Sequence, residues 1–123
     1  MVEADIIQYF LSIIAQVKLF HWSTTQYAEH IALDKLHGSL SDKVDSFVES
    51  YIGKYKKQPL KPFTIQTKAV SDASGITKFL EITNDQLANM HKVFEKEKAP
   101  ELVNIIEEMM SEIDTTMYLC KLL

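Results

Sequence analysis

The sequence contains no arginine, because all thirteen of its basic residues are lysines. Arginine supplies the planar, bidentate fork with which many proteins hold phosphates and guanine edges. The net charge is −4, so the chain also has no overall positive charge with which to neutralise phosphates. The missing arginine and the acidic balance together argue against a protein that binds nucleic acid.

Cysteine is nearly absent as well. Cys120 is the single cysteine, so no intramolecular disulfide can form, and a reducing compartment such as the cytoplasm is expected. The first basic residue is Lys18, so the chain does not begin with the basic segment of a signal peptide. Gln8, Ser12 and Gln16 interrupt the longest apolar stretch, which is unfavourable for a membrane span.

Glycine and proline are scarce, with three of each in 123 residues. This scarcity favours long helices over a turn-rich β fold. The apolar fraction of 46% is too high for a disordered chain. A chain of this length makes one domain with one core and accommodates four helices of ordinary length. We therefore predict that residues 1–123 form a single all-α domain, a four-helix bundle.

Four segments carry apolar residues at helical spacing, which predicts one buried stripe on each helix. The predicted core positions are Ile6, Phe10, Ile13, Val17 and Phe20; Leu33, Leu36, Leu40, Val44, Phe47 and Tyr51; Ile76, Leu80, Thr83, Leu87, Met90 and Phe94; and Leu102, Ile106, Met109, Ile113, Met117 and Cys120. The first segment bears a second stripe of Ile7, Leu11 and Ile14. We therefore expect the first helix to be buried on two sides, against its own bundle and against a partner subunit.

Turn and cap residues separate the predicted helices. Ser23 with Gln26 fits a capping box, which predicts that the second helix starts there. Pro59 prevents simple continuation of that helix. The polar stretch 58–75 then fits the long connection between the second and third helices of an up-down-up-down bundle. Pro100 suits the first turn of a fourth helix.

Histidines and carboxylates on the first two helices are the residues that can hold a metal ion. Asp45 and Glu49 are four residues apart, so they lie one turn apart on one helical face. Two carboxylates so placed can share one metal ion or hold two adjacent ones. His30 precedes Asp45 by fifteen residues, which is about 22 Å along a helix. Two chains packed antiparallel about a two-fold axis near Gly38 would bring these ligands together, with two shared sites in each dimer.

His21-Trp22, His30 and Asp45-x-x-x-Glu49 together resemble the ferroxidase motif of Dps proteins, the small dodecameric ferritins. The resemblance implies a ferritin-like bundle with an iron site shared across a two-fold interface, and with His21, His30, Asp45 and Glu49 as ligands. It also implies that Fe(II) binds and is oxidised by peroxide or oxygen, with Trp22 nearby as an electron donor. Imidazole and carboxylate ligands suit zinc and manganese as well as iron.

The chain also departs from that family. The connection between His21 and His30 is shorter than the family's, and the arginine-glycine pair usual there is absent. So is the basic N-terminal tail by which some members bind DNA. These departures keep open the alternative of a metal-free relative, a structural or partner-binding homodimer. Both hypotheses expect self-association through the second helix, and the choice between a dimer and a larger shell stays open.

Each candidate residue also has a structural interpretation. The carboxylate pair would be a solvated helix face, and His21 would cap the end of its helix, where a positive charge is favourable. Trp22 is expected to pack in the core or in an interface, and His37 to make an interface hydrogen bond. His91 is expected to have a structural role, and Cys120, on the predicted core face, to be chemically inert.

Overall fold

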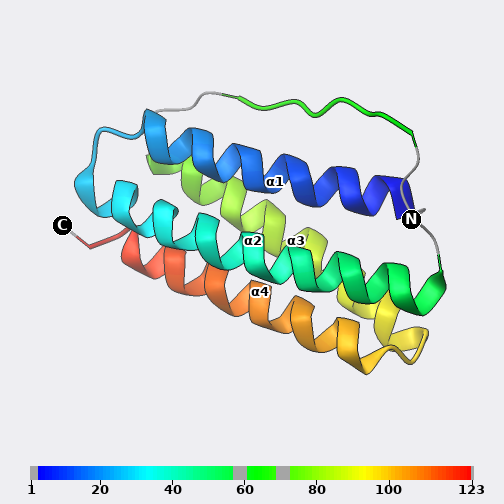
Figure 1. Cartoon of the computed structure of the whole chain (residues 1–123). Coiled ribbons are helices and arrows are strands. Elements are labelled where there is room, and N and C mark those ends of the chain that lie inside the picture. Colours follow the sequence, from blue (N-terminus) through cyan, green and yellow to red (C-terminus); the bar gives the residue numbers. More distant parts are fainter. Residues whose placement is uncertain (1–2, 57–60, 69–72, 123) are drawn as a thin grey trace.

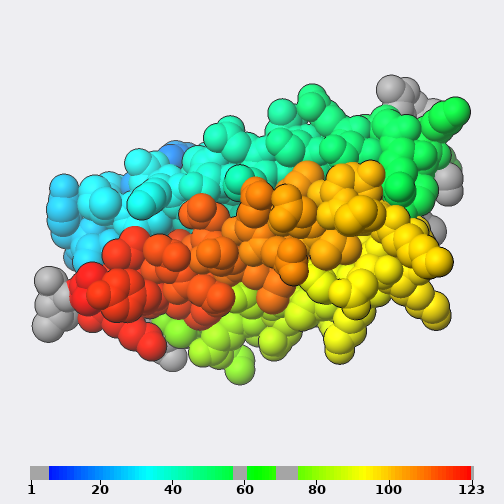
Figure 2. Space-filling view, turned by 90° about the horizontal axis from the view of Figure 1, so that it is seen from below, coloured from blue at the N-terminus to red at the C-terminus, as the bar shows by residue number. Residues whose placement is uncertain are grey.

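The computed structural model describes residues 3–56, 61–68 and 73–122 and contains four helices. They are α1 (Glu3–Ser23), α2 (Tyr27–Tyr55), α3 (Ala73–Lys96) and α4 (Pro100–Leu119). Figure 1 shows the four helices packed side by side as a bundle, and Figure 2 shows α4 flanked by α2 and α3 on one face. No strand occurs in these ranges. The predicted all-α four-helix bundle is confirmed.

A single hydrophobic core runs between the helices, and it contains nearly all of the predicted core positions. At its centre the ring of Phe47 makes edge-to-face contacts with Phe10 and Phe94, with centroids 5.1 and 5.6 Å apart. Edge-to-face packing is a favoured arrangement of aromatic rings. None of the four helices, within the part that the structure describes, has the length and apolar character that a membrane span requires.

The end of α4 differs from the predicted stripe. Thr116 is buried there, whereas Met117 and Cys120 are half-buried. The hydroxyl of Thr116 donates to the carbonyl of Glu112, one turn earlier, so its burial leaves the hydroxyl with a partner. Burial, and then the charge of Glu29, raises the pKa of the Cys120 thiol to about 11. A thiol that stays protonated at neutral pH is a poor nucleophile.

Residues 61–68, which belong to the connection between α2 and α3, lie along α1. Residues 61–68 contain no helix, and they are held at two levels of α1. The side-chain amide of Gln8 donates to the carbonyl of Thr64 at 2.6 Å, and the backbone N–H of Lys68 donates to the side-chain oxygen of Gln16 at 2.7 Å. The segment therefore runs toward the C-terminal end of α1, as Figure 1 shows.

This return makes α2 and α3 parallel. Phe47 and Tyr51, near the end of α2, both contact Phe94, which lies near the end of α3. The predicted up-down-up-down order is therefore wrong between the second and third helices. Polar composition predicted a connection but not its direction, which depends on the hydrogen bonds that hold it along α1.

The predicted capping box at the start of α2 is also wrong. Ser23 still belongs to α1, and its hydroxyl donates to the carbonyl of Leu19 at 2.7 Å. Thr24 takes part instead: its hydroxyl oxygen accepts from the backbone N–H of Gln26 at 3.2 Å, and its hydroxyl donates to Glu29 at 2.5 Å. The helix continues one residue further than expected, so the next hydroxyl in the sequence supports the turn. Pro100 is in the first turn of α4, as predicted.

Candidate metal centre

His21 and His30 lie together where α1 turns into α2. Their rings are stacked, with centroids 3.9 Å apart and planes 18° apart. Nδ1 of His21 is 2.7 Å from the carbonyl oxygen of His30, and Nδ1 of His30 is 2.8 Å from the carbonyl oxygen of His21. A carbonyl oxygen only accepts, so each Nδ1 carries a hydrogen. In the neutral rings the lone pair is then on Nε2, which is the arrangement of metal-ligating histidines.

The local backbone explains why the two rings meet. The last carbonyls of a helix have no partner within that helix, and the carbonyl of His21 is in the last turn of α1. His30 is in the first turns of α2, after a link of only residues 24–26. The short link therefore brings His30 beside the open carbonyl of His21, and the reciprocal bonds join the two helices.

Asp34 is a further candidate ligand that the sequence motif did not include. It follows His30 by one helical turn, and its Oδ1 is 3.7 Å from Nε2 of His21. Lys18 donates to the same oxygen at 3.1 Å, and this hydrogen bond and the lysine charge hold the pKa of Asp34 below its ordinary value. The carboxylate is exposed, so it is ionised at neutral pH and can turn from Lys18 to a cation. The i, i+4 spacing from His30 was the signal for it in the sequence.

Asp45 and Glu49 lie elsewhere on α2. Both are exposed, and neither makes an ion pair with any residue of the described ranges. The helix between His30 and Asp45 is continuous, so the two side chains are about 22 Å apart along its axis. In the described part of the chain no three histidine, cysteine, aspartate or glutamate side chains are placed to hold one metal ion. One chain thus brings His21 and His30 together and leaves Asp45 and Glu49 apart from them.

An apolar groove lies between α1 and α2, and Asp45 is on its wall. The groove has a volume of about 220 Å³ and is lined by Ile7, Leu11, Ile14, Ser41, Val44, Asp45 and Val48. Leu11 is 42% exposed and Ile14 half-buried, whereas Ile7 is buried. The second apolar stripe of the first helix is therefore only partly covered by its own bundle. The partner subunit predicted to cover the rest stays a prediction.

Three other residues near the histidine pair have defined environments. Trp22 is 69% exposed, with Nζ of Lys18 5.7 Å from its ring centroid, so core packing is excluded for it. His37 is half-buried, and burial, followed by the charge of Lys18, lowers its pKa. Glu29 is buried, and its Oε2 has no hydrogen-bond partner among the residues that the structure describes. The negative charge of Glu29 is favourable in the first turn of α2 because of the helix dipole.

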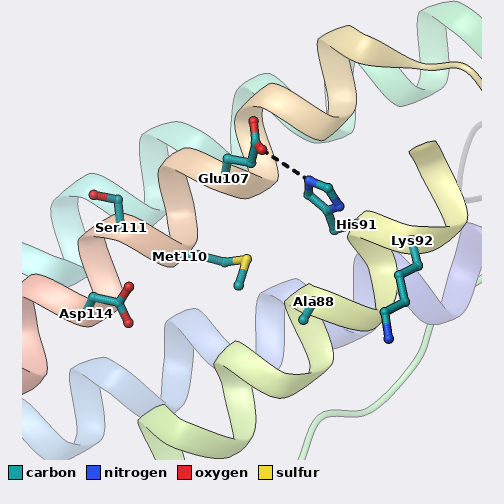
Figure 3. A pocket seen from close by; sticks show the side chains of 7 residues that line it. All are labelled: Ala88, His91, Lys92, Glu107, Met110, Ser111 and Asp114. Carbon is teal, nitrogen blue, oxygen red and sulfur yellow. Dashed lines mark hydrogen bonds and ion pairs between the residues drawn. The ribbon is translucent and has the colours of Figure 1, made fainter.

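The remaining histidine lies in a groove between α3 and α4, which Figure 3 shows. Nε2 of His91 is 3.2 Å from Oε2 of Glu107, and both line this groove with a volume of about 460 Å³. Asp114, further along the groove, accepts a 2.7 Å hydrogen bond from Asn84. The histidine and both carboxylates of this groove thus have partners within the chain, unlike Asp45 and Glu49 of α2.

Comparisons with known proteins assign the chain to a family but not to an activity. The family described as "family of unknown function (DUF5856)" matches residues 21–120. Neither the curated proteins nor the solved structures contain a match to the chain. The matched region begins at His21 and includes His30, Asp45 and Glu49. Since this region is most of the sequence, the chain belongs to the DUF5856 family, whose function is unknown.

Proposed function

We propose that this protein is a ferritin-like iron-binding protein that oxidises Fe(II) at a site completed by a second copy of the chain. The observation that carries the proposal is the reciprocal pair of His21 and His30. Each Nδ1 donates to a carbonyl of the other residue, so both rings are oriented and each neutral ring has its lone pair on Nε2.

The course of the chain agrees with a ferritin-like bundle. Ferritin-like folds contain one long crossover connection, and the segment 61–68 lies along α1 and returns the chain so that α2 and α3 are parallel. A strictly alternating bundle would not need such a return. The path of the backbone thus supports the ferritin-like assignment independently of the metal ligands.

A two-fold dimer through α2 supplies the missing ligands. With the axis near Gly38, His30 of one chain approaches Asp45 and Glu49 of the other, and each dimer has two equivalent sites. Gly38 is exposed, and a Cβ added to it would meet no atom of its own chain within 4 Å. A glycine inside a helix is unfavourable by roughly 1 kcal/mol relative to alanine, and close approach of a second α2 gives it a role. The exposed apolar groove with Leu11 lies beside the same face.

The ligand set fits iron as the substrate of the site. Two imidazole nitrogens with carboxylates from the partner suit Fe(II), and the same set takes zinc or manganese. The carboxylates neutralise the charge of the cation, and they can bridge a second one. In the oxidation, two Fe(II) ions each give one electron to hydrogen peroxide, which takes up two protons and leaves as two waters. Oxygen is the alternative oxidant.

An anaerobic Fe(II) titration by calorimetry tests the proposal. The intact protein is expected to bind about one or two irons per chain, as di-metal carboxylate sites do, and Asp45→Ala is expected to abolish saturable binding. Glu107→Ala is the matched control, because it removes an exposed carboxylate from the α3/α4 groove, and it should bind iron normally. Equal binding by the two variants would refute the site.

A metal-free homodimer is the second candidate function. The ion pair of Lys18 with Asp34 favours it. The lysine already neutralises the carboxylate beside the two histidines, so no metal ion is needed there to balance its charge. The exposed groove would then be a protein interface alone. Iron titration separates the two candidates: a protein that dimerises in sedimentation equilibrium but binds neither Fe(II) nor zinc would be the structural homodimer.

A further inference from the structure

We propose that Lys35 and Asp42 set the register of the α2–α2 contact by forming two reciprocal ion pairs between the chains of the dimer. This inference rests on the homodimer of the proposed function and deepens it, because the register decides which ligands of one chain face the histidines of the other. It assigns an interchain role to two charged residues that are not metal ligands.

Both residues are on the outward side of α2 and have no ion-pair partner in the described part of their own chain. They are exposed, and neither takes part in an ion pair within the described ranges. Seven residues of a helix make about two turns, so the two side chains share one face but are about 10 Å apart along the axis. Residues three or four apart form ion pairs within a helix, and residues seven apart do not. The two side chains therefore do not pair with each other within one helix, and a second copy of α2 can supply a partner for each.

The other lysines of α2 are already engaged. Lys43 contacts Glu108 of α4, and Lys54 is 3.6 Å from Glu101 of α4. Lys35 is consequently the one lysine of α2 without an ion-pair partner in the described part of the chain. The outward side otherwise carries negative charge, from Asp42, Asp45 and Glu49 among others. Two such faces repel each other unless each unpaired lysine meets a carboxylate of the other chain.

The two-fold axis that serves the metal site also pairs these charges. An axis midway between His30 and the carboxylates Asp45 and Glu49 places Lys35 of each chain level with Asp42 of the other. A two-fold operation also keeps each residue on its own lateral side of the contact. At 100° per residue, Lys35 and Asp42 lie on the flank of α2 nearer to Lys43, which contacts α4, whereas His30 lies on the flank that bonds to α1. The ion pairs and the metal ligands thus occupy opposite flanks of one contact.

Neighbouring registers lose this complementarity. A shift of one helical turn in one direction places Lys35 opposite Gly38, and a shift in the other direction places it opposite Ser46. Either shift also moves His30 about one turn away from its carboxylates. The register that neutralises Lys35 is the register that assembles the metal ligands, so the charge pairs favour the productive dimer before any metal binds.

Charge reversal in the metal-free protein tests the register. Lys35→Glu places two pairs of like charges in its homodimer, as does Asp42→Lys, and each variant should dimerise at least ~10-fold more weakly than the intact protein. An equimolar mixture of the two variants should recover the intact affinity. In the mixed dimer the introduced glutamate faces the introduced lysine, and the native Asp42 of one chain faces the native Lys35 of the other. Sedimentation equilibrium at low and high salt measures this, and the recovery should shrink as salt rises.

The control uses a pair that lies within one chain. Lys43→Glu and Glu108→Lys break the contact between α2 and α4, and mixing those variants should recover nothing. All four substitutions are on the surface, and circular dichroism verifies that each variant is folded. An intact protein that dimerises while the Lys35 and Asp42 variants fail to complement each other would overturn the register. Complementation in a protein that binds no iron would keep the register and reject the proposed function.

Discussion

The groove between α1 and α2 differs from the groove between α3 and α4 in whether its carboxylates have partners within the chain. In the α3/α4 groove, His91 pairs with Glu107, and Asn84 donates to Asp114, so the histidine and both carboxylates have partners within the chain. On the α1/α2 face, Lys35 and Asp45 have no ion pair in the described part of the chain, and Leu11 is 42% exposed beside a groove. The contrast is therefore between the histidine and carboxylates of the α3/α4 groove, which have partners in the chain, and Asp45 of the α1/α2 groove, which has none in the described residues.

The two faces therefore differ in what each would gain from being covered by a second molecule. A surface whose charges are matched internally gains little from a partner, because rim charges that are already paired contribute little. A surface with unmatched charges of both signs around an apolar groove gains both apolar burial and charge pairing when it is covered. The proposed contact between copies, and the proposed metal site that depends on it, therefore use the α1/α2 face.

The largest expected effect is a charge in the α1/α2 groove. Leu11→Asp places one unpaired carboxylate from each chain in the proposed interface, and we expect dimerisation to weaken by about 3 kcal/mol or more because both charges lose water. Met110→Asp makes a similar change in the α3/α4 groove and should leave dimerisation unchanged. Sedimentation equilibrium measures both. Equal effects of the two substitutions would remove the distinction between the faces.

Alanine at the two glycines of α2 should have a smaller effect, which stabilises the monomer at both positions but weakens the dimer at only one. A Cβ added at Gly38 or Gly53 meets no atom of its own chain within 4 Å, so alanine at either should raise the unfolding free energy of the monomer by up to about 1 kcal/mol. Only Gly38 lies near the proposed axis, so Gly38→Ala should weaken the dimer whereas Gly53→Ala should not. Chemical denaturation at low and high protein concentration separates the two contributions. A dimer unaffected by Gly38→Ala would place the axis elsewhere.

His37 predicts a pH dependence for the α1/α2 face. Burial, and then the charge of Lys18, lowers its pKa from 6.5, so the unfolded chain binds a proton more readily than the folded one. Stability therefore rises with pH through this window, and it is lost as the pH falls below 6.5 toward the lower pKa of the folded state. Chemical denaturation across this pH range should show that the unfolding free energy changes less steeply with pH in His37→Gln than in the intact protein. An unchanged slope would mean that other groups dominate the acid response.

The smallest effect is expected on the α3/α4 face. His91→Gln removes an exposed pair with Glu107, and such pairs contribute about 0.2–1 kcal/mol. Iron binding and dimerisation should be those of the intact protein. Calorimetry and thermal unfolding of this variant thus check that the α3/α4 histidine is separate from the metal site, and a loss of bound iron would join the two.

The sequence was sufficient for the helices because their cores depend on a local period. Phe10, Leu36, Leu87 and Ile106 were predicted to be buried from apolar spacing alone, and they are. The direction of the connection between α2 and α3 was mispredicted. It depends on hydrogen bonds from Gln8 and Gln16 to residues more than fifty positions away, and no local pattern encodes such a contact.

The candidate site was predictable in part for the same reason. The spacing of His30, Asp45 and Glu49 is readable along one helix, and it implies that a metal ion held by all three would need two chains. The stacking of His21 on His30 depends on the turn between α1 and α2. A capping box was predicted at Ser23 in this turn, whereas Thr24 makes the hydrogen bonds there, with Gln26 and Glu29. Asp34 was on the right stripe, but its closeness to His21 emerges only from packing.

The most direct test of the shared site is complementation between two inactive variants. His30→Ala and Asp45→Ala should each fail to bind iron as homodimers, because every site lacks a ligand. After subunit exchange, one site of each mixed dimer regains all its ligands, so calorimetry should recover about one quarter of the intact protein's Fe(II) sites. No recovery in a mixture shown to have exchanged subunits would contradict the account, because each chain would then bind iron alone or not at all.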